Sequence, residues 1–240
     1  METTAAPTQG SAPATNEDRF KPVASPVHTF VVLAVLGVWA YFGVFRAEHL
    51  RAAENVDRIR LYLRTVTFEW LLLAFVLFGL WMRKTPFRVV LGERWHSLRA
   101  FGRDLGLGVL FLFGALMISS VFIAHGHGSA DPAVRYMLPV TGSERALWIL
   151  LSLTAGICEE AVNRGYLQRQ LTAWTSNAAV GIVLQALIFG ALHAYQGFAR
   201  TIPIGMLGLL LGVLTWWRKT VRPGMITHFL QDSLALFVPR

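Results

Sequence analysis

The sequence predicts an all-α membrane protein, a polytopic bundle of about seven transmembrane helices, on three observations. Hydrophobic residues make up 54% of the 240 residues and charged residues only 15%. The mean hydropathy is positive, at +0.49. Apolar segments of about membrane-spanning length recur along the chain, separated by short charged connections. This pattern is typical of polytopic membrane proteins and argues against a soluble enzyme.

The apolar segments define the predicted helices, because a helix needs about 20 residues to cross roughly 30 Å of hydrocarbon. We place them at 27–45, 62–82, 104–124, 144–173, 177–196, 202–217 and 223–238. In the fourth, the apolar run Ala146 to Ile157 continues into a more polar, strongly helical stretch, so we expect one long helix that projects beyond the bilayer. In the sixth, three glycines share roughly one face, which predicts a close approach of two helices. They are Gly205, Gly208 and Gly212.

The first 26 residues differ from the rest of the chain. They are rich in Ala, Pro and Thr and contain no apolar run, so we predict a disordered tail at 1–26 before a single transmembrane bundle at 27–240. The first apolar segment is longer than a typical signal core. It is followed by Arg46 and not by a small-residue cleavage site, so no cleavable signal peptide is expected.

The net charge of +8 could suggest a nucleic-acid partner, but the cations lie in the connections, where Lys and Arg set membrane orientation. We therefore expect a lipid bilayer around the protein and no nucleic acid. The tail and the second, fourth and sixth connections, with Arg164 counted in the fourth, hold 13 of the 22 Lys and Arg residues, which predicts a cytoplasmic N-terminus. Five arginines of the first connection oppose this assignment, and an amphipathic helix at 50–63 would change the topology.

Three short groups of ionisable and aromatic residues lie in the apolar second half of the chain. They are Glu159-Glu160 with Arg164, Phe189 with His193, and His228 with Asp232. Each group spans about one helical turn. An ionisable side chain in hydrocarbon costs several kcal/mol unless it is paired or used, so the three groups together predict a functional site.

Depth along the helices favours one shared site. Glu159 is 15 residues and His193 17 residues from the turn that joins their helices, which is roughly 23 to 26 Å at about 1.5 Å per residue. His228 and Asp232 lie roughly 12 to 18 Å from the turn near Thr220. If the fourth and fifth helices extend about two turns beyond the membrane surface, all three groups meet at a similar depth.

The residue types favour water activation. A carboxylate in a low-dielectric pocket holds a proton more readily than in water, so Glu159 and His193 together could deprotonate a water molecule. His228 and Asp232 would then polarise the scissile carbonyl and its oxyanion, or bind a metal. Glu159, His193, His228 and Asp232 are all possible zinc ligands. No H-E-x-x-H motif occurs and the spacing fixes no tetrahedral geometry, so we favour a metal-free site with zinc as the alternative.

Each group taken singly has a simpler explanation. The first could be an ion-pair cluster whose charges reach the water at a helix end, and His193 or the pair on the last helix could be packing or headgroup-level residues. The conjunction of the three favours a site. Among other candidates, Cys158 is interpreted as a buried packing residue, His125 and His127 as part of a flexible Gly-rich loop, and Glu69 is left open, as a cavity residue or a partner of Arg64 or Arg83.

The three motifs resemble those of the CPBP intramembrane proteases, which include the CAAX prenyl endopeptidases of the Ras-converting type and the bacterial ABI proteins. The resemblance covers residues 144–238. It implies a helical bundle with a cavity open to the cytosol and bilayer, in a bacterial inner membrane, that hydrolyses a peptide bond near a membrane-anchored end of a peptide or protein substrate. The family has been described both as metal-dependent and as glutamate-type.

The resemblance also implies roles for individual residues. Glu159 would activate water with His193, and His228 with the residue at Asp232 would bind the oxyanion. Glu160 and Arg164 would support the site or hold the substrate.

One residue departs from the prenyl-processing members, which carry Asn where this chain has Asp232. Asn can donate a hydrogen bond to an oxyanion, whereas an ionised Asp can only accept. Asp232 must therefore be protonated, orient His228 or bind a metal. Two other classes of function stay open: a non-catalytic immunity or assembly factor of the same fold, and a small proton-coupled transporter that uses the buried carboxylates as a relay.

Overall fold

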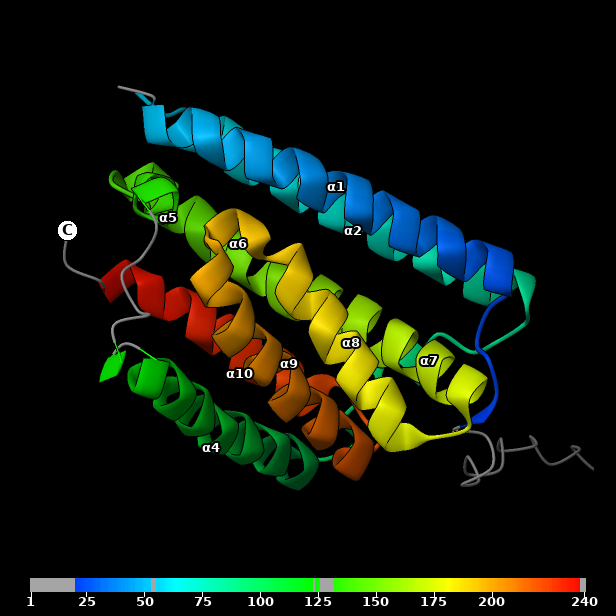
Figure 1. Cartoon of the computed structure of the whole chain (residues 1–240). Coiled ribbons are helices and arrows are strands. Elements are labelled where there is room, and N and C mark those ends of the chain that lie inside the picture. Colours follow the sequence, from blue (N-terminus) through cyan, green and yellow to red (C-terminus); the bar gives the residue numbers. More distant parts are fainter. Residues whose placement is uncertain (1–19, 53–54, 123, 126–131, 238–240) are drawn as a thin grey trace, which may run out of the picture.

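The computed structural model describes residues 20–52, 55–122, 124–125 and 132–237. Every regular element among these residues is a helix, so the all-α prediction is confirmed. The long helices run side by side and alternate in direction (Figure 1).

Seven helical elements correspond to the seven predicted segments. They are α1 (Pro26–Ala52), α2 (Arg58–Met82), α4 (Leu98–Phe122), the continuous helix formed by α6 (Gly142–Glu160), η3 (Ala161–Leu167) and α7 (Gln168–Thr175), α8 (Ala178–Leu192), α9 (Phe198–Arg218), and α10 (Arg222–Ser233) with the 3₁₀ turn η5 (Leu234–Phe237). Three short elements lie in the connections: α3 (Arg88–Leu91), α5 (Pro132–Met137) and the 3₁₀ turn η4 (Ala194–Gln196).

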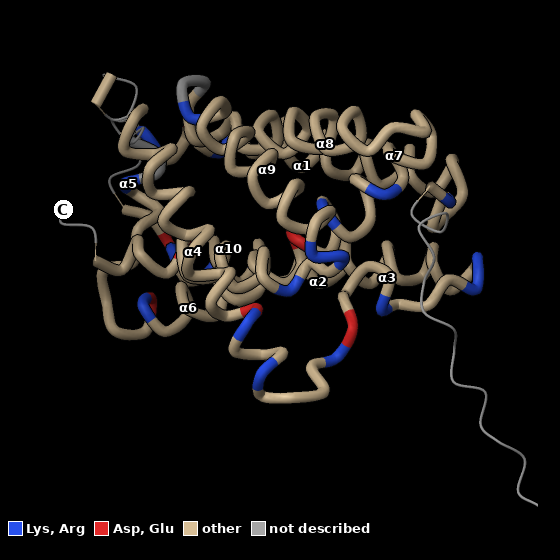
Figure 2. Tube along the Cα trace, turned by 90° about the horizontal axis from the view of Figure 1, so that it is seen from below, with Lys and Arg blue, Asp and Glu red and all other residues tan. Residues whose placement is uncertain are grey.

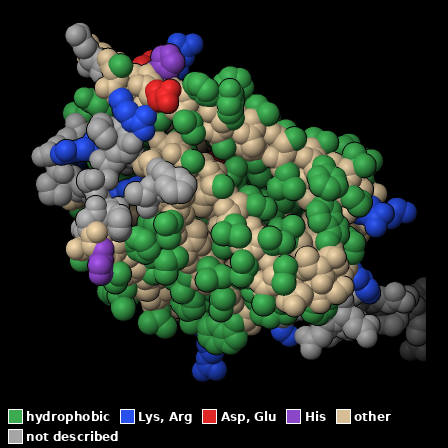
Figure 3. Space-filling model, in the orientation of Figure 1, with side chains coloured by type: hydrophobic (Ala, Val, Ile, Leu, Met, Phe, Trp, Pro, Cys, Tyr) green, Lys and Arg blue, Asp and Glu red, His purple; other side chains and the backbone are tan. Residues whose placement is uncertain are grey.

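Five of these helices are long and apolar enough to cross a membrane: α1, α2, α4, the α6–η3–α7 helix, and Arg200–Arg218 of α9. The fifteen-residue α8 is apolar but shorter. Large hydrophobic side chains lie on the outer surface of the bundle (Figure 3), for example Val27 of α1 at 74% exposure and Leu187 of α8 at 64%. An outer surface of this kind is stable in hydrocarbon but not in water. Lys and Arg lie mostly in the connections and at helix ends (Figure 2).

The fourth segment forms one helix from Gly142 to Thr175, which confirms the long-helix prediction. Its N-terminus is fixed by a capping box in which Thr141 and Glu144 each accept a hydrogen bond from the other's backbone N–H. Directly after Glu159 and Glu160 the helix widens into the π-helical stretch Ala161–Leu167. Such stretches are uncommon and are frequent at functional sites.

Glycines allow the helices around this stretch to approach closely. A Cβ added at Gly208 of α9 would lie 3.2 Å from the Cα of Ala186 on α8, and Gly205 also faces α8, as predicted from their spacing. Gly156 of α6 makes an even closer contact with α10, since an added Cβ would lie 2.9 Å from the carbonyl oxygen of Met225. These contacts hold α9 against α8, and α10 against the helix that carries Glu159.

Two predicted boundaries differ from the structure. Part of the predicted tail is packed, because the buried Val23 and Ala24 donate their backbone N–H groups to Oε1 of Gln170, at 2.6 and 3.3 Å. Residues 1–19 lie outside the described residues. The stretch 50–63 is not one amphipathic helix, since α1 runs to Ala52 and α2 begins at Arg58.

Candidate active site

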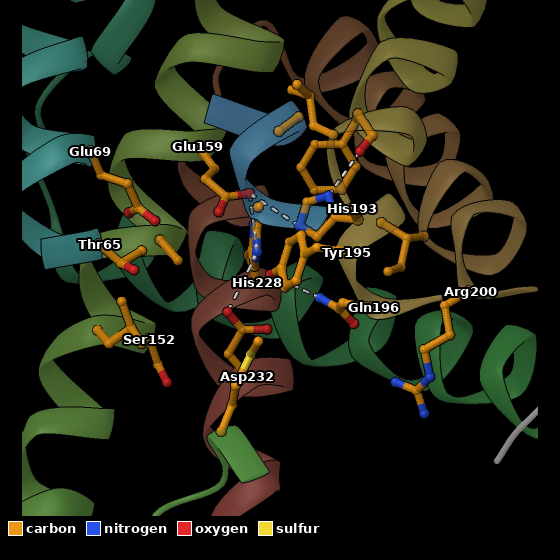
Figure 4. A pocket seen from close by; sticks show the side chains of 18 of the residues that line it. Thr65, Glu69, Ser152, Glu159, His193, Tyr195, Gln196, Arg200, His228 and Asp232 are labelled. Atoms are coloured by element: carbon orange, nitrogen blue, oxygen red, sulfur yellow. Dashed lines mark hydrogen bonds and ion pairs between the residues drawn. The ribbon is translucent and has the colours of Figure 1, made fainter. Parts of the chain in front are cut away.

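A cavity of 430 Å³ lies inside the bundle, and its lining includes residues of α1, α2, α4, α6, η3, α8, η4, α9 and α10. Its walls are largely apolar, and Glu159, His193, His228 and Asp232 all face it (Figure 4). The structure therefore brings together four side chains that the sequence places on three separate helices. Whether these residues are catalytic stays a prediction.

The Glu159 carboxylate lies at the centre of this group. Its Oε2 atom is 3.9 Å from Nε2 of His193 and 4.0 Å from Nε2 of His228. Both distances are too long for a direct hydrogen bond but suit two groups joined through a water molecule. One carboxylate oxygen and two imidazole nitrogens thus converge on a space of about the right size for a water.

His193 is fixed at the C-terminal end of α8 by its own helix. Its Nδ1 donates to the backbone carbonyl of Phe189 at 2.8 Å, and its ring lies 4.7 Å from the Phe189 ring, as predicted from the four-residue spacing. The carbonyl can only accept, so Nδ1 must carry a proton. This orientation leaves Nε2 directed at Glu159.

His228 is fixed from the opposite side by Glu160. Its Nδ1 lies 2.9 Å from Oε1 of Glu160, and the same oxygen accepts a hydrogen bond from Arg164 at 2.8 Å. The predicted pairing of Glu160 with Arg164 is thus confirmed. The Arg164 guanidinium stacks over the Phe189 ring, 4.0 Å from its centroid. The His228 ring also packs against Phe189, so the same aromatic ring contacts both histidines.

The contacts among Glu160, Arg164 and Phe189 lie in the core of the bundle, where a charged group without a partner is costly. Glu160 and Arg164 are both 0% exposed, and Phe189 is 1% exposed. Arg164, which the sequence suggested as a cation of the fourth connection, instead lies in the core of the bundle. Arg164 therefore does not count among the cations of the connections, and the number of cations assigned to the cytoplasmic side falls by one.

Asp232 lies one turn after His228 on α10. Its Oδ2 is 3.6 Å from Nε2 of His228, the nitrogen that also faces Glu159. The carboxylate is half-buried. Of the three roles open to Asp232, this contact favours orientation and charge stabilisation of His228.

Glu69 is a site residue that the sequence left open. It lines the cavity at 7% exposure, and its Oε2 has no hydrogen-bond partner among the described residues. Arg64 and Arg83 are the two partners that the sequence suggested for Glu69. Within the residues that the structure describes, neither forms an ion pair with the Glu69 carboxylate. Its position in an apolar segment was the available signal, but spacing alone does not show which way one side chain faces.

Other cavity residues were missed. Tyr195 and Gln196 line it directly after His193, where Gln196 donates to the Tyr195 hydroxyl at 3.1 Å. Arg46, Arg64 and Arg200 also line it. The sequence predicts an orienting role for Arg46 and Arg64, with Arg64 also a possible partner of Glu69, and gives no signal for Arg200. Cys158 is buried as predicted, whereas His127 lies outside the described residues.

Within residues 20–52, 55–122, 124–125 and 132–237, no three or more His, Cys, Asp or Glu side chains are arranged to hold a metal ion. His193 and His228 each use Nδ1 in a protein contact and turn Nε2 toward Glu159. A histidine that binds a metal is commonly held in the same way.

Comparison with known proteins agrees with the motifs. Residues 141–234 match the family described as type II CAAX prenyl endopeptidase, Rce1-like. This segment is similar to Rce1-like proteins. It contains all three motifs, covers 94 of the 240 residues, and confirms the resemblance to the CPBP and CAAX proteases. No curated protein and no solved structure matches the chain.

The match to the Rce1-like family and the apolar helices together indicate an integral membrane protein. The match supports protease activity in general. The helices α1, α2 and α4 lie before the matched segment, and all three contribute walls to the cavity.

Proposed function

We propose that this protein is an intramembrane endopeptidase that hydrolyses a peptide bond near the membrane surface with a water molecule activated by Glu159. One observation carries the proposal. The Oε2 atom of Glu159 lies almost equally far from Nε2 of His193 and Nε2 of His228, at 3.9 and 4.0 Å. This geometry suits a base, a water molecule and an oxyanion donor around one carbonyl group.

The reaction follows from the proton positions. Glu159 accepts a proton from the water, and the Nε2 lone pair of His193 helps to orient that water. The water oxygen attacks the scissile carbonyl carbon, the C–N bond breaks, and Glu159 returns the proton to the leaving amine. Glu159 thus acts first as base and then as acid.

His228 stabilises the oxyanion as an imidazolium. The Nδ1–H of His228 donates a hydrogen bond to Glu160. His228 can therefore donate a hydrogen bond to the oxyanion only when Nε2 also carries a proton. Three carboxylates surround this ring, those of Glu159, Glu160 and Asp232, and they favour the charged form. Asp232 compensates for the missing amide donor by stabilising this imidazolium.

Replacement of Glu159 tests the function. We expect Glu159→Gln to lose at least about 100-fold in peptide cleavage, since the amide cannot take the proton from water, while the protein stays folded in detergent. Glu93→Gln is the control, because Glu93 is exposed and pairs only with Arg88 at 3.2 Å. Full cleavage by Glu159→Gln would remove the proposal.

The same variant separates the two other classes. An immunity or assembly factor would keep its phenotype with Gln at 159, whereas a proton-coupled transporter would lose coupled transport. A purely structural factor does not need the two histidines and two carboxylates of this site in contact, at 3.9 Å for His193–Glu159, 4.0 Å for His228–Glu159 and 3.6 Å for His228–Asp232.

The metal question has its own test. We favour the glutamate-type mechanism over a metallo-type one, and expect cleavage to persist in chelator. Stoichiometric zinc in the purified protein together with activity lost in chelator would overturn this preference and would assign zinc to Glu159, His193, His228 and Asp232.

The proposed setting is a bacterial inner membrane, with the N-terminus in the cytoplasm and a membrane-associated peptide or protein as substrate. The family description and the apolar helices support a membrane setting. The excess of cations at the N-terminal end of the bundle supports the orientation.

A further inference from the structure

Glu69 is a buried carboxyl group in the cavity wall that the reaction proposed above does not use. It is the only charged residue type among the buried residues of α2. The others are Tyr62, Leu72, Leu73, Val76, Gly79 and Leu80. Glu69 is 7% exposed, and its side chain points from α2 toward Glu159 (Figure 4). A carboxyl group in an otherwise apolar stripe of a membrane helix indicates a function.

No cation neutralises this carboxyl group within the residues that the structure describes. Arg64 precedes Glu69 by five residues on α2, but its guanidinium lies over the Trp39 ring, 5.8 Å from the centroid. Oε2 of Glu69 is buried and has no hydrogen-bond partner in the same part of the chain. An ionised carboxylate in such a place costs far more than the neutral acid, so burial favours the protonated form.

The groups that face Glu69 favour the same form. Glu159 of α6 and Asp232 of α10, which interact electrostatically with it, are themselves carboxyl groups, and the buried Cys158 of α6 also lies close to it. His228 is the cation of the proposed reaction, and its ionic contacts are to other carboxylates. Like charges disfavour each other in one dry cavity, so the carboxyl group without a partner is the one that stays neutral.

Contact between α2 and α6 fixes the position of Glu69. Trp70, the next residue, donates its indole N–H to Oγ1 of Thr154 at 3.2 Å. One turn before Glu69, the Thr65 hydroxyl donates to the backbone carbonyl of Leu61 at 3.1 Å and so has no proton left for a ligand. Glu69 therefore meets an entering substrate from a fixed helix, in the same cavity as the water-activating carboxylate.

We propose that Glu69 is a neutral carboxylic acid that binds the backbone of the peptide substrate beside the scissile bond, an inference that rests on the proposed endopeptidase function. A neutral acid has one O–H donor and one carbonyl acceptor. An extended peptide presents the N–H and the C=O of one residue on the same side, and these two groups match that pair. An ionised carboxylate only accepts, and would repel the substrate carbonyl.

The protonation state can be measured without a substrate. An infrared difference spectrum between the native chain and Glu69→Gln, in detergent at neutral pH, should contain the C=O stretch of a protonated carboxyl group. A difference spectrum with only the bands of an ionised carboxylate would contradict the proposal. Thr65→Val is the matched control, because it alters the cavity wall one turn away and should leave the band in place.

Peptide binding tests the contact itself. The probes are a short fluorescent apolar peptide and a series in which each backbone amide in turn is an ester, titrated against the full chain carrying Glu159→Gln in detergent. An ester has no N–H, so one member of the series should bind about tenfold more weakly. Adding Glu69→Leu should weaken the all-amide peptide at least about tenfold and abolish that difference. Adding Glu69→Gln, which keeps one donor and one acceptor, should preserve both.

Kinetics and stability separate this role from a structural one. In the otherwise native chain, Glu69→Leu should raise KM about tenfold with kcat within about threefold, as for an interaction made equally in the ground and transition states. Its thermal unfolding temperature should be equal or higher, since an apolar side chain replaces a buried polar group without a partner. Equal damage by Glu69→Gln and Glu69→Leu, or a fall in stability that accounts for the lost activity, would show that the proposal is wrong.

The outcomes also separate the proposal from the function on which it rests. If the native chain cleaves the peptide but neither an ester nor Glu69→Leu changes binding, the Glu69 site is removed and the peptidase stays. If an ester effect depends on Glu69 but no cleavage occurs, the binding site stays and the peptidase is removed. Absence of binding across the whole series would overturn the proposal.

Discussion

Asp232 shows how one atom changes the chemistry of the site. Its Oδ2 lies 3.6 Å from Nε2 of His228, where the prenyl-processing members carry an amide. We expect Asp232→Asn to keep cleavage within about tenfold, because the amide can accept from His228 and donate to the oxyanion. Asp232→Leu should lose at least about 100-fold, as for removal of an oxyanion-site group. Rates measured in detergent check this, and equal activity of the two variants would contradict the role of Asp232.

Arg164 is the residue on which the stability of the site depends most. It is 0% exposed and donates to Glu160 at 2.8 Å, so Arg164→Met leaves a buried carboxylate without its cation. Breaking such a pair costs about 3–5 kcal/mol of folding free energy. We expect a clear fall in the thermal unfolding temperature in detergent. Arg88→Met is the control, since its exposed pair with Glu93 contributes at most about 1 kcal/mol.

At the scale of single residues, the sequence showed which side chains could carry chemistry but not which way they face. Spacing predicted the pairing of Glu160 with Arg164 and the contact of Phe189 with His193, since both lie within one helix. The burial of Arg164 and the cavity position of Glu69 depend on contacts between helices. Such contacts produce no regular spacing of residues along the chain, so the sequence pattern could not predict them.

At the scale of elements, the close approach of α6 and α10 places His228 beside Glu160. Gly156 permits it, because a Cβ there would lie 2.9 Å from the Met225 carbonyl oxygen and 3.1 Å from the Phe229 nitrogen. Gly156→Ala must therefore push the α10 backbone away. We expect at least about a tenfold loss of cleavage from the displaced His228, as for misplacement by about 1 Å, with helix content by circular dichroism retained.

Gly106→Ala is the matched control for that variant. Gly106 lies on α4, and an added Cβ there meets no atom within 4 Å. Unchanged activity is expected, with slightly higher stability from the helix preference of Ala. Native activity in Gly156→Ala would show that α10 can move without displacing the site.

Hydropathy located the seven predicted helical segments, and the five long ones need only length and apolar composition, since each satisfies its backbone polar groups within itself. The short α3 and α5, of four and six residues, gave no periodic signal. The π-helical stretch Ala161–Leu167 was also not expected. It depends on packing around Gly165 and Arg164, which local propensity does not contain.

At the scale of the whole molecule, two predictions from sequence cannot hold together. The cation count predicts a cytoplasmic N-terminus, whereas the family resemblance implies a cavity open to the cytosol. In the structure the cavity lining reaches Leu50 near the end of α1 and Leu61 near the start of α2, so the cavity extends toward the end of the bundle opposite the start of α1 (Figure 1). No count of loop charges could show this conflict, because the sequence does not say at which end the cavity opens.

Cysteine labelling decides between the two orientations. Cys158, the only native cysteine, is buried, and Cys158→Ser gives a background for single cysteines at Ser97, at the end of the bundle where α1 begins, and at Gly142, at the opposite end. Four cations in the connection between α2 and α4, with Arg99 and Arg103 in the first turns of α4, outweigh the opposing loops. We therefore expect a membrane-impermeant maleimide added to intact cells to label the cysteine at 142 and not that at 97. Labelling at 97 alone would instead turn the end that carries Gly142 to the cytoplasm and bring the charge distribution, and not the cavity, into conflict with the family.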